Sequence, residues 1–248
     1  MKFIKSELED YKILLRAIPC SVVVLFCTSV IMMNLLANKE VITGVDWLRL
    51  DCGFFLSWMS FLSMDIITKR FGPKASIKIS IFAMGINLLV CLINFIIVHI
   101  PGNWAMFYDL GDSANIALNA TFGGTWYVLL GSTVAMLTSS VVNSTINYSL
   151  GKLFNKTSKV EFMVRSYVST FIGQFIDNLI FATMVSYIFF GWTPTQVVIC
   201  ALTGAIAELL CEVIFSPIGY RISKNWEAEN VGQNYVNYAT SKKEGNYE

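Results

Sequence analysis

The chain divides into six long apolar runs that are separated by short polar segments. The runs extend over residues 17–37, 52–67, 79–100, 126–150, 167–190 and 195–215. A helix needs about 20 mostly apolar residues to cross the roughly 30 Å hydrocarbon core of a bilayer. Strands of a membrane barrel would instead show segments of about ten residues in which apolar and polar positions alternate. The pattern therefore predicts an all-α integral membrane bundle of six transmembrane helices.

Basic residues gather in every second gap between these runs. Four Lys or Arg residues precede the first run, and four more lie in each of the second-to-third, fourth-to-fifth and final segments. These account for sixteen of the eighteen in the chain, and the exceptions are Lys39 and Arg49. Because cytoplasmic loops of membrane proteins are enriched in Lys and Arg, the alternation predicts cytoplasmic N- and C-termini and a multi-pass protein of the cell membrane.

The 248 residues leave little room beyond the helices, since 55% of them are hydrophobic and 14% are charged. Soluble domains usually carry about 25% charged residues. We expect a cytoplasmic amphipathic segment over residues 1–16, a six-helix transmembrane domain over 17–222 and a polar cytoplasmic tail over 223–248. Residues 113–122 are too polar to span, and they predict a short helix that lies on the outer surface or dips into it.

Composition and motifs argue against several other classes of protein. The basic residues flank the apolar runs, so they indicate orientation rather than a nucleic-acid partner. The six cysteines form no CxxC pair, which argues against a metal or a redox cofactor. The chain has no GxSxG elbow, no HExxH motif and no phosphate-binding GxxxxGK[ST] loop. We therefore expect a protein that is not an enzyme and does not itself hydrolyse ATP.

Polar residues within the apolar runs are the candidate site. Asp177 lies inside the fifth run, with Gln174 three residues before it and Thr170 seven before it. This spacing places all three on one helix face. Ionisable side chains inside a bilayer cost several kcal/mol and usually have a function. The alternative is a polar clamp that only ties helices together.

A second candidate is the pair Glu208 and Glu212 in the sixth run. The two are four residues apart and share a helix face, where like charges repel. One of them is then expected to hold a proton, or to face water or a cation. Such a pair can take up a proton or accept hydrogen bonds from a ligand. In the alternative reading, both side chains face a cytoplasmic vestibule.

The remaining candidates come from the first, second and fourth runs. Asp65 lies near the cytoplasmic end of its run, where Lys69 four residues on offers a simple surface ion pair as the alternative. Asn34 and Asn143 contribute amides. Trp58 has a ring that can stack on a flat solute, although a core tryptophan is the commoner arrangement. Together these residues suggest a cavity for a small polar molecule.

Four segments resemble the vitamin uptake transporter (Vut) family, which is also called the queuosine precursor transporter family. They are NLLANK at 34–39, FFLSWMSFLSMDIITKRFGPKA at 54–75, VRSYVSTFIGQFIDNLIF at 164–181 and LLCEVIFSPIGY at 209–220. They occur in order, from the first run to the last. Departures lie close to the candidate site: Lys69 replaces an acidic residue, Ser140 and Asn143 stand where the family often has Gln and Asp, and the sixth run has a different charge pattern.

The resemblance implies six spans and the import of 7-deazaguanine precursors of queuosine, a modified base of transfer RNA. A deazaguanine has adjacent N–H donors that one carboxylate accepts together. Asp177 or Glu212 suits this role, with Gln174 at the carbonyl edge. The expected partners are this small molecule and the bilayer, and a homodimer is one open alternative for the assembly.

Three other functions stay open at this stage. The chain could be the substrate-binding subunit of a vitamin uptake system that a separate ATPase module energises. It could be a membrane enzyme that acts on a lipid, or a receptor that binds without transport. Flux through the isolated chain distinguishes the first and third from a transporter, and a catalytic constellation formed on folding would indicate the second.

Overall fold

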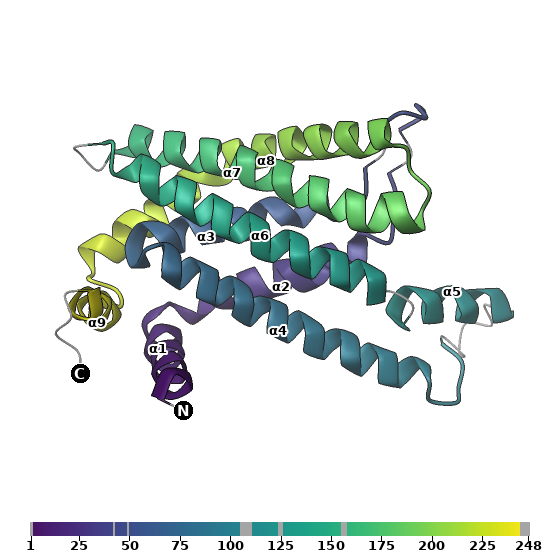
Figure 1. Ribbon diagram of the computed structural model, residues 1–248, viewed down its shortest axis with the longest axis horizontal. Helices are drawn as coiled ribbons and strands as arrows, with labels where there is room; N and C mark the ends of the chain where they lie inside the picture. Colours follow the sequence, from purple (N-terminus) through teal and green to yellow (C-terminus); the bar gives the residue numbers. More distant parts are fainter. Residues whose placement is uncertain are drawn as a thin grey trace.

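The computed structural model describes residues 2–41, 43–48, 50–104, 111–123, 126–154 and 158–243. Six long helices lie side by side (Figure 1). They are α2 (Cys20–Leu36), α3 (Phe54–Phe71), α4 (Pro73–Val98), α6 (Trp126–Gly151), α7 (Lys159–Phe181) and α8 (Pro194–Ala228). Shorter helices are α1 (Lys2–Ala17), α5 (Gly111–Gly123) and α9 (Gln233–Lys243), and a π-helical turn, η2 (Ala182–Tyr187), continues α7. The described residues contain no strand, only an isolated bridge between Glu40 and Asp51.

Four helical stretches are long and apolar enough to cross a membrane: α4, the stretch that contains α6, α7 with η2, and α8. Helices α1 and α2 together make a fifth candidate, although they are bent by 108°. Helix α3 is shorter, with 18 residues, and carries Asp65, Lys69 and Arg70. The expected all-α membrane bundle is confirmed, whereas the count of six spans stays a prediction.

Helix α3 lies at the centre of the bundle and packs against α2, α4, α6, α7 and α8. Its buried side chains include Ser57, Ser60, Asp65 and Thr68 as well as apolar residues. By contrast, α4 exposes a run of large apolar side chains: Leu88, Leu89, Leu92, Ile93, Phe95, Ile96 and Ile97. Lipid offers no hydrogen bonds, so polar groups within a membrane are satisfied inside the protein. The polar interior and apolar exterior therefore suit a bilayer.

Local sequence explains how the helices begin and turn. Gly72 has a φ of +86° and ends α3, and Pro73 follows at the first turn of α4. Glycine adopts this conformation without steric cost, and proline suits the first turn of a helix. The hydroxyl of Ser158 caps α7 by accepting the N–H of Glu161, and Thr193 forms a capping box with Gln196 at the start of α8. These signals fix the hairpins α3–α4 and α7–α8.

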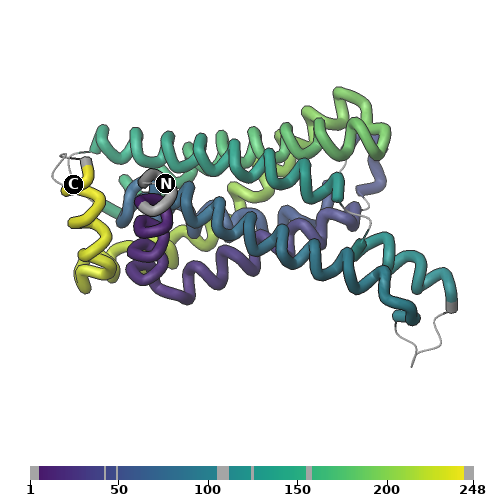
Figure 2. The backbone as a smooth tube through the Cα atoms, turned by 60° about the horizontal axis from the view of Figure 1, so that its bottom comes forward, coloured from purple at the N-terminus to yellow at the C-terminus, as the bar shows by residue number. Residues whose placement is uncertain are grey.

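Both termini lie at the same end of the bundle (Figure 1). We call this the basic end, because the helix ends there carry Lys69, Arg70, Arg165, Arg221 and Lys224. Helices α1 and α9 cross it side by side, while α5 lies beyond the opposite end (Figure 2). The predicted N-terminal amphipathic segment and the predicted short helix at 113–122 are both helical in the structure. Residues 223–228, expected in the tail, still belong to α8.

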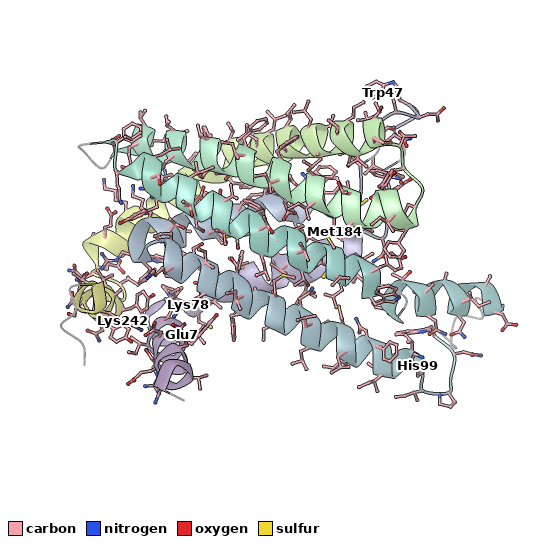
Figure 3. All side chains as sticks on the ribbon, in the orientation of Figure 1. Glu7, Trp47, Lys78, His99, Met184 and Lys242 are labelled. Carbon is pink, nitrogen blue, oxygen red and sulfur yellow. The ribbon has the colours of Figure 1, made fainter. Side chains whose placement is uncertain are left out.

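Asp10 joins α1 to α4 and α9 at the basic end. It accepts hydrogen bonds of 2.9 Å from Lys78 and Lys242 and another from the Tyr238 hydroxyl. Glu7 is also 2.9 Å from Lys78 (Figure 3). Burial alone would raise the pKa of Asp10, but the bonds from Tyr238, Lys78 and Lys242 outweigh it and lower the pKa to about 2. A single carboxylate thus holds both terminal helices against the bundle.

Candidate functional site

A small cavity of about 40 Å³ lies among α2, α3, α6, α7 and α8, toward the end opposite the basic end. We call it the outer hollow. Its lining includes Asn34, Ser57, Asp177, Asn178 and Glu208. Three of these, Asn34, Asp177 and Glu208, are site residues predicted from the sequence, and the fold brings them together from three helices. Two carboxyl groups and two amides therefore face one cavity.

Hydroxyl and amide groups of neighbouring helices hold the two carboxyl groups of the outer hollow. Ser139 of α6 donates to Oδ1 of Asp177 at 2.7 Å. Ser57 of α3 donates to Oε1 of Glu208, and the Asn178 amide donates to Oε2 at 3.3 Å. Each carboxyl group keeps its position through contacts that cross between helices. The orientation of both groups thus depends on how α3, α6, α7 and α8 pack.

Asp51 brings a third carboxyl group to the outer hollow, from the loop before α3. Burial, with a smaller contribution from the charge of Glu40, raises the pKa of Asp51 to about 6 against the opposing hydrogen bond from the N–H of Gly53, 2.7 Å from Oδ1. Sequence reasoning missed this residue, because an aspartate just before an apolar run resembles an ordinary loop residue. The rim of the hollow can consequently change its charge near neutral pH.

A second group of polar side chains lies closer to the basic end and is completely buried. We call it the inner cluster, and its members are Asp65, Asn143, Ser166, Thr170 and Glu212. The Asn143 amide donates to Oδ1 of Asp65 at 2.9 Å, and Thr170 lies 3.4 Å from Oδ2. The Ser166 hydroxyl contacts both Asp65 and Glu212. Four of these five were predicted; Ser166 was not.

Gln174 lies on α7 between the inner cluster and the outer hollow, and 0% of its surface is exposed. It follows Thr170 of the inner cluster by one turn and precedes Asp177 of the outer hollow by three residues. Neither its amide nitrogen nor its carbonyl oxygen has a hydrogen-bond partner. Leaving a buried donor or acceptor unpaired costs about 1–3 kcal/mol. Among the described residues, Gln174 therefore keeps a buried amide whose donor and acceptor are both free for another partner.

Ion pairs at the basic end lie next to the inner cluster. Lys69 and Arg165 are each 2.9 Å from a carboxylate oxygen of Glu161, and Arg165 also donates to Asn147 at 2.6 and 2.8 Å. The alternative reading of Asp65 as a surface partner of Lys69 is wrong, because Asp65 is buried and Lys69 binds Glu161. Because α7 packs against α3, the carboxylate of Glu161 lies within reach of Lys69, and Lys69 pairs with it rather than with Asp65 of its own helix.

Among known proteins, the family model described as "Putative vitamin uptake transporter" matches residues 51–222. The chain belongs to this family. The matched region runs from the loop before α3 into α8, and it contains the whole inner cluster and every lining residue of the outer hollow named above except Asn34. The resemblance found in the sequence is thus confirmed at family level. No curated protein and no solved structure matches the chain.

Within this member of the vitamin uptake transporter family, Trp58 lies apart from the candidate site. Its ring stacks on Phe215 with centroids 4.2 Å apart and planes at 11°, and its N–H donates to the carbonyl of Phe55 at 2.8 Å. The structure does not place it among the lining residues of the outer hollow. The core arrangement, which the sequence left as an alternative, is the one that the structure shows.

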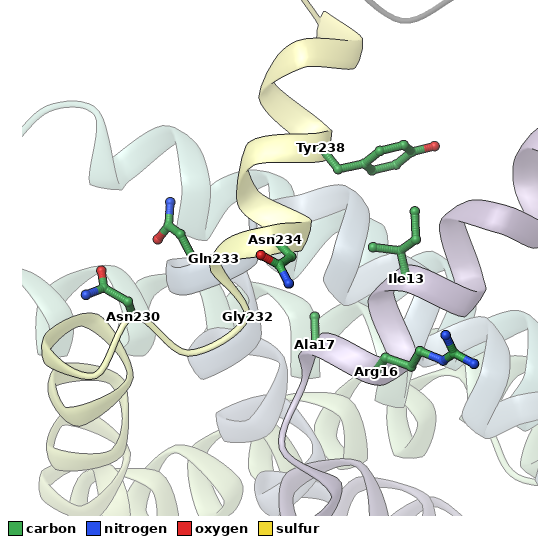
Figure 4. A pocket seen from close by; sticks show the side chains of 8 residues that line it. All are labelled: Ile13, Arg16, Ala17, Asn230, Gly232, Gln233, Asn234 and Tyr238. Atoms are coloured by element: carbon green, nitrogen blue, oxygen red, sulfur yellow. The ribbon is translucent and has the colours of Figure 1, made fainter.

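A larger hollow of about 610 Å³ opens at the basic end of this transporter-family protein, between α1 and the turn into α9 (Figure 4). Its polar lining comes from Arg16, Asn230, Gln233, Asn234 and Tyr238. None of these residues belongs to the outer hollow or the inner cluster. Among the described residues, no group of His, Cys, Asp and Glu side chains is arranged to hold a metal ion. The buried polar groups between α3, α6, α7 and α8 thus remain the candidate transport site.

Proposed function

We propose that the protein imports a small, flat, polar metabolite of the 7-deazaguanine type, a queuosine precursor, across the cytoplasmic membrane. Its membership of the vitamin uptake transporter family supports uptake of a small solute. The basic end faces the cytoplasm in this proposal, as the distribution of Lys and Arg predicts. The substrate then enters from the side of the outer hollow.

The observation that carries the proposal is the unpaired amide of Gln174. A ligand that offers an acceptor and a donor to this amide recovers the cost of leaving both of its atoms unpaired. Asp177 lies three residues away, and its carboxyl group accepts a hydrogen bond from Ser139. A deazaguanine edge has a carbonyl beside adjacent N–H groups. Such an edge matches an amide and a carboxylate that lie on one helix face.

The size of the outer hollow indicates a closed conformation. Its volume of about 40 Å³ is enough for a few water molecules, each of which needs roughly 10–15 Å³. Pockets for small organic ligands usually measure about 300–1,000 Å³. Binding therefore requires the helices around the hollow to separate. Rocking of one group of helices against another is the usual way in which transporters open a central site.

Purified protein in lipid vesicles tests the proposal. Labelled 7-deazaguanine should exchange with unlabelled 7-deazaguanine across the vesicle membrane, and Asp177→Asn should abolish the exchange. Asp112→Asn, a matched change at an exposed residue of α5, should leave it unchanged. Exchange at the wild-type rate in Asp177→Asn would refute the assignment of this residue.

A thermal-shift panel of deazaguanines, nucleobases and water-soluble vitamins tests the class of substrate. A true ligand raises the apparent stability by an amount that grows with the logarithm of its concentration relative to Kd. Stabilisation by a vitamin alone would replace the deazaguanine assignment. Stabilisation without any flux in vesicles would instead favour a substrate-binding subunit that depends on a separate ATPase module.

A further inference from the structure

Ser166 lies between two buried carboxyl groups that come from different helices. Its hydroxyl is within hydrogen-bonding distance of Oδ2 of Asp65 on α3 and of Oε1 of Glu212 on α8. All three side chains have 0% of their surface exposed. A serine hydroxyl has one hydrogen, so it donates to only one of the two carboxyl groups. The other contact needs a proton on a carboxyl oxygen.

The remaining contacts indicate which carboxyl group holds that proton. Asp65 is well supplied with donors, since Asn143 donates at 2.9 Å and Thr170 and Ser169 lie at 3.4 and 3.5 Å. Glu212 receives no amide donor: hydroxyl groups of Ser166 and Thr170 are its neighbours, and its Oε2 has no hydrogen-bond partner. An ionised carboxylate with a bare buried oxygen is far more costly than a neutral acid. Asp65 is thus the ionised member and accepts a hydrogen bond from Ser166. Glu212 is the protonated member, and its O–H donates a hydrogen bond to the Ser166 oxygen.

The charges around the pair agree with this assignment. Hydrogen bonds and ion pairs link Lys69, Glu161, Arg165 and, through Asn147 and Ser169, Asp65. Two cations and two carboxylates balance in this chain of contacts, and a further charge on Glu212 would be left without a counter-ion. Besides Glu161 and Arg165, α7 carries Asp177, and α8 carries Glu208 one turn from Glu212; Asp177 and Glu208 both line the outer hollow. Helix α6 contributes only amides and hydroxyls, and Lys78 of α4 is paired with Glu7 and Asp10.

We propose that Asp65, Ser166 and Glu212 form a site that binds one proton, and that this proton moves inward with each imported substrate molecule. The inference rests on the proposed transport function. In the inward step the O–H bond of Glu212 breaks, the proton passes to water at the basic end, and the electron pair stays on the carboxylate. A proton from the outer side restores the acid. Glu208, one turn away on α8, lines the outer hollow and connects the site to that side.

Infrared spectroscopy tests the proton site without any substrate. A protonated carboxyl group has a C=O absorption that an ionised carboxylate lacks. Wild-type protein at neutral pH should show a component of this absorption that is lost in Glu212→Gln and retained in Glu229→Gln, a matched change at an exposed glutamate near the basic end. Spectra of the wild type and Glu212→Gln that are identical in this region would overturn the proposal.

Vesicle transport tests the coupling. With acid outside, wild-type protein should accumulate labelled 7-deazaguanine at least about tenfold over the level without a pH gradient. Glu212→Gln should lose this accumulation but retain exchange of labelled for unlabelled 7-deazaguanine, because exchange needs no net proton movement. Accumulation at the wild-type level in Glu212→Gln would overturn the coupling. If the wild type exchanges no compound of the panel, the transport function fails, while the infrared result still decides the proton site.

Discussion

The hydroxyl of Ser139 on α6 donates a 2.7 Å hydrogen bond to Oδ1 of Asp177 on α7. This bond fixes the direction of a carboxyl group that lines the outer hollow. Ser139 is fully buried, and its own helix also offers it an acceptor, the carbonyl of Met136 at 3.2 Å. The Ser139 hydroxyl can therefore donate either to the Met136 carbonyl or to the carboxyl group of Asp177. Substrate binding at Asp177 is expected to depend on which of these hydrogen bonds forms.

We expect Ser139→Ala to weaken uptake without preventing folding. Loss of one hydrogen bond to a charged or ligand-binding group costs about 1.5–3 kcal/mol, which corresponds to roughly a 10- to 100-fold loss of affinity. Competition for uptake in vesicles measures this change. Thr138→Ala removes a neighbouring hydroxyl that bonds only its own backbone, so it should leave affinity unchanged. Equal affinities for wild type and Ser139→Ala would show that Asp177 does not need this donor.

Glu161 supports two cations, and its loss is expected to destabilise the fold. The carboxylate pairs with Lys69 and Arg165, and all three side chains are at most 8% exposed. Removing one partner from a buried ion pair typically costs about 3–5 kcal/mol. Glu161→Gln should therefore unfold at lower denaturant concentration, as followed by circular dichroism in detergent.

Two further variants make the Glu161 test specific. Glu229→Gln changes an exposed glutamate near the same end, and its stability should stay within about 0.5 kcal/mol of the wild type. Lys69→Met combined with Glu161→Gln should cost less than the two single changes added together, because the residues share one interaction. Additive effects would mean that the ion pair does not contribute to stability.

The helices of this fold were predictable, because long apolar runs and alternating basic loops are local properties of the chain. Buried carboxyl groups were predictable for the same reason: Asp65, Asp177, Glu208 and Glu212 stand out within apolar sequence. The partners of these groups were not. Lys69 lies four residues from Asp65, yet it binds Glu161, which is 92 positions away. Only the packing of α7 against α3 determines that pairing.

Serines of the candidate site illustrate the second limit of the sequence. A serine in an apolar helix can bond its own backbone, as Ser29 does with Leu25, or reach another helix, as Ser57 and Ser166 do. Nothing in the local sequence separates these cases. Trp58 illustrates the same limit for aromatic residues, since the sequence allowed either a ring that stacks on a solute or a core tryptophan, and the structure shows its ring stacked on Phe215.

Close packing of α7 at Gly173 gives a further prediction. A Cβ at this position would lie 2.7 Å from Cε1 of Phe61 and 3.0 Å from Cβ of Asn143. Helix α7 can therefore pack this closely against α3 and α6 because residue 173 has no side chain. Overpacking of this kind costs about 1–3 kcal/mol. Gly173→Ala should lower thermal stability in detergent. Gly85→Ala on α4, where nothing lies within 4 Å, should be neutral or stabilising. Similar losses for both would contradict this account of the packing.

Release of the terminal helices in acid is expected from the pKa of Asp10. This pKa is lowered from 3.8 to about 2, so the ionised form stabilises the docking of α1 and α9 above pH 3.8. The stabilisation, about 2–2.5 kcal/mol, is lost as the pH falls through about 2. Hydrogen exchange of α9 should accelerate over this range in the wild type. In Asp10→Asn the exchange should be fast at every pH, whereas Asp112→Asn should behave like the wild type. Exchange in Asp10→Asn as slow as in the wild type at neutral pH would mean that other contacts hold α9.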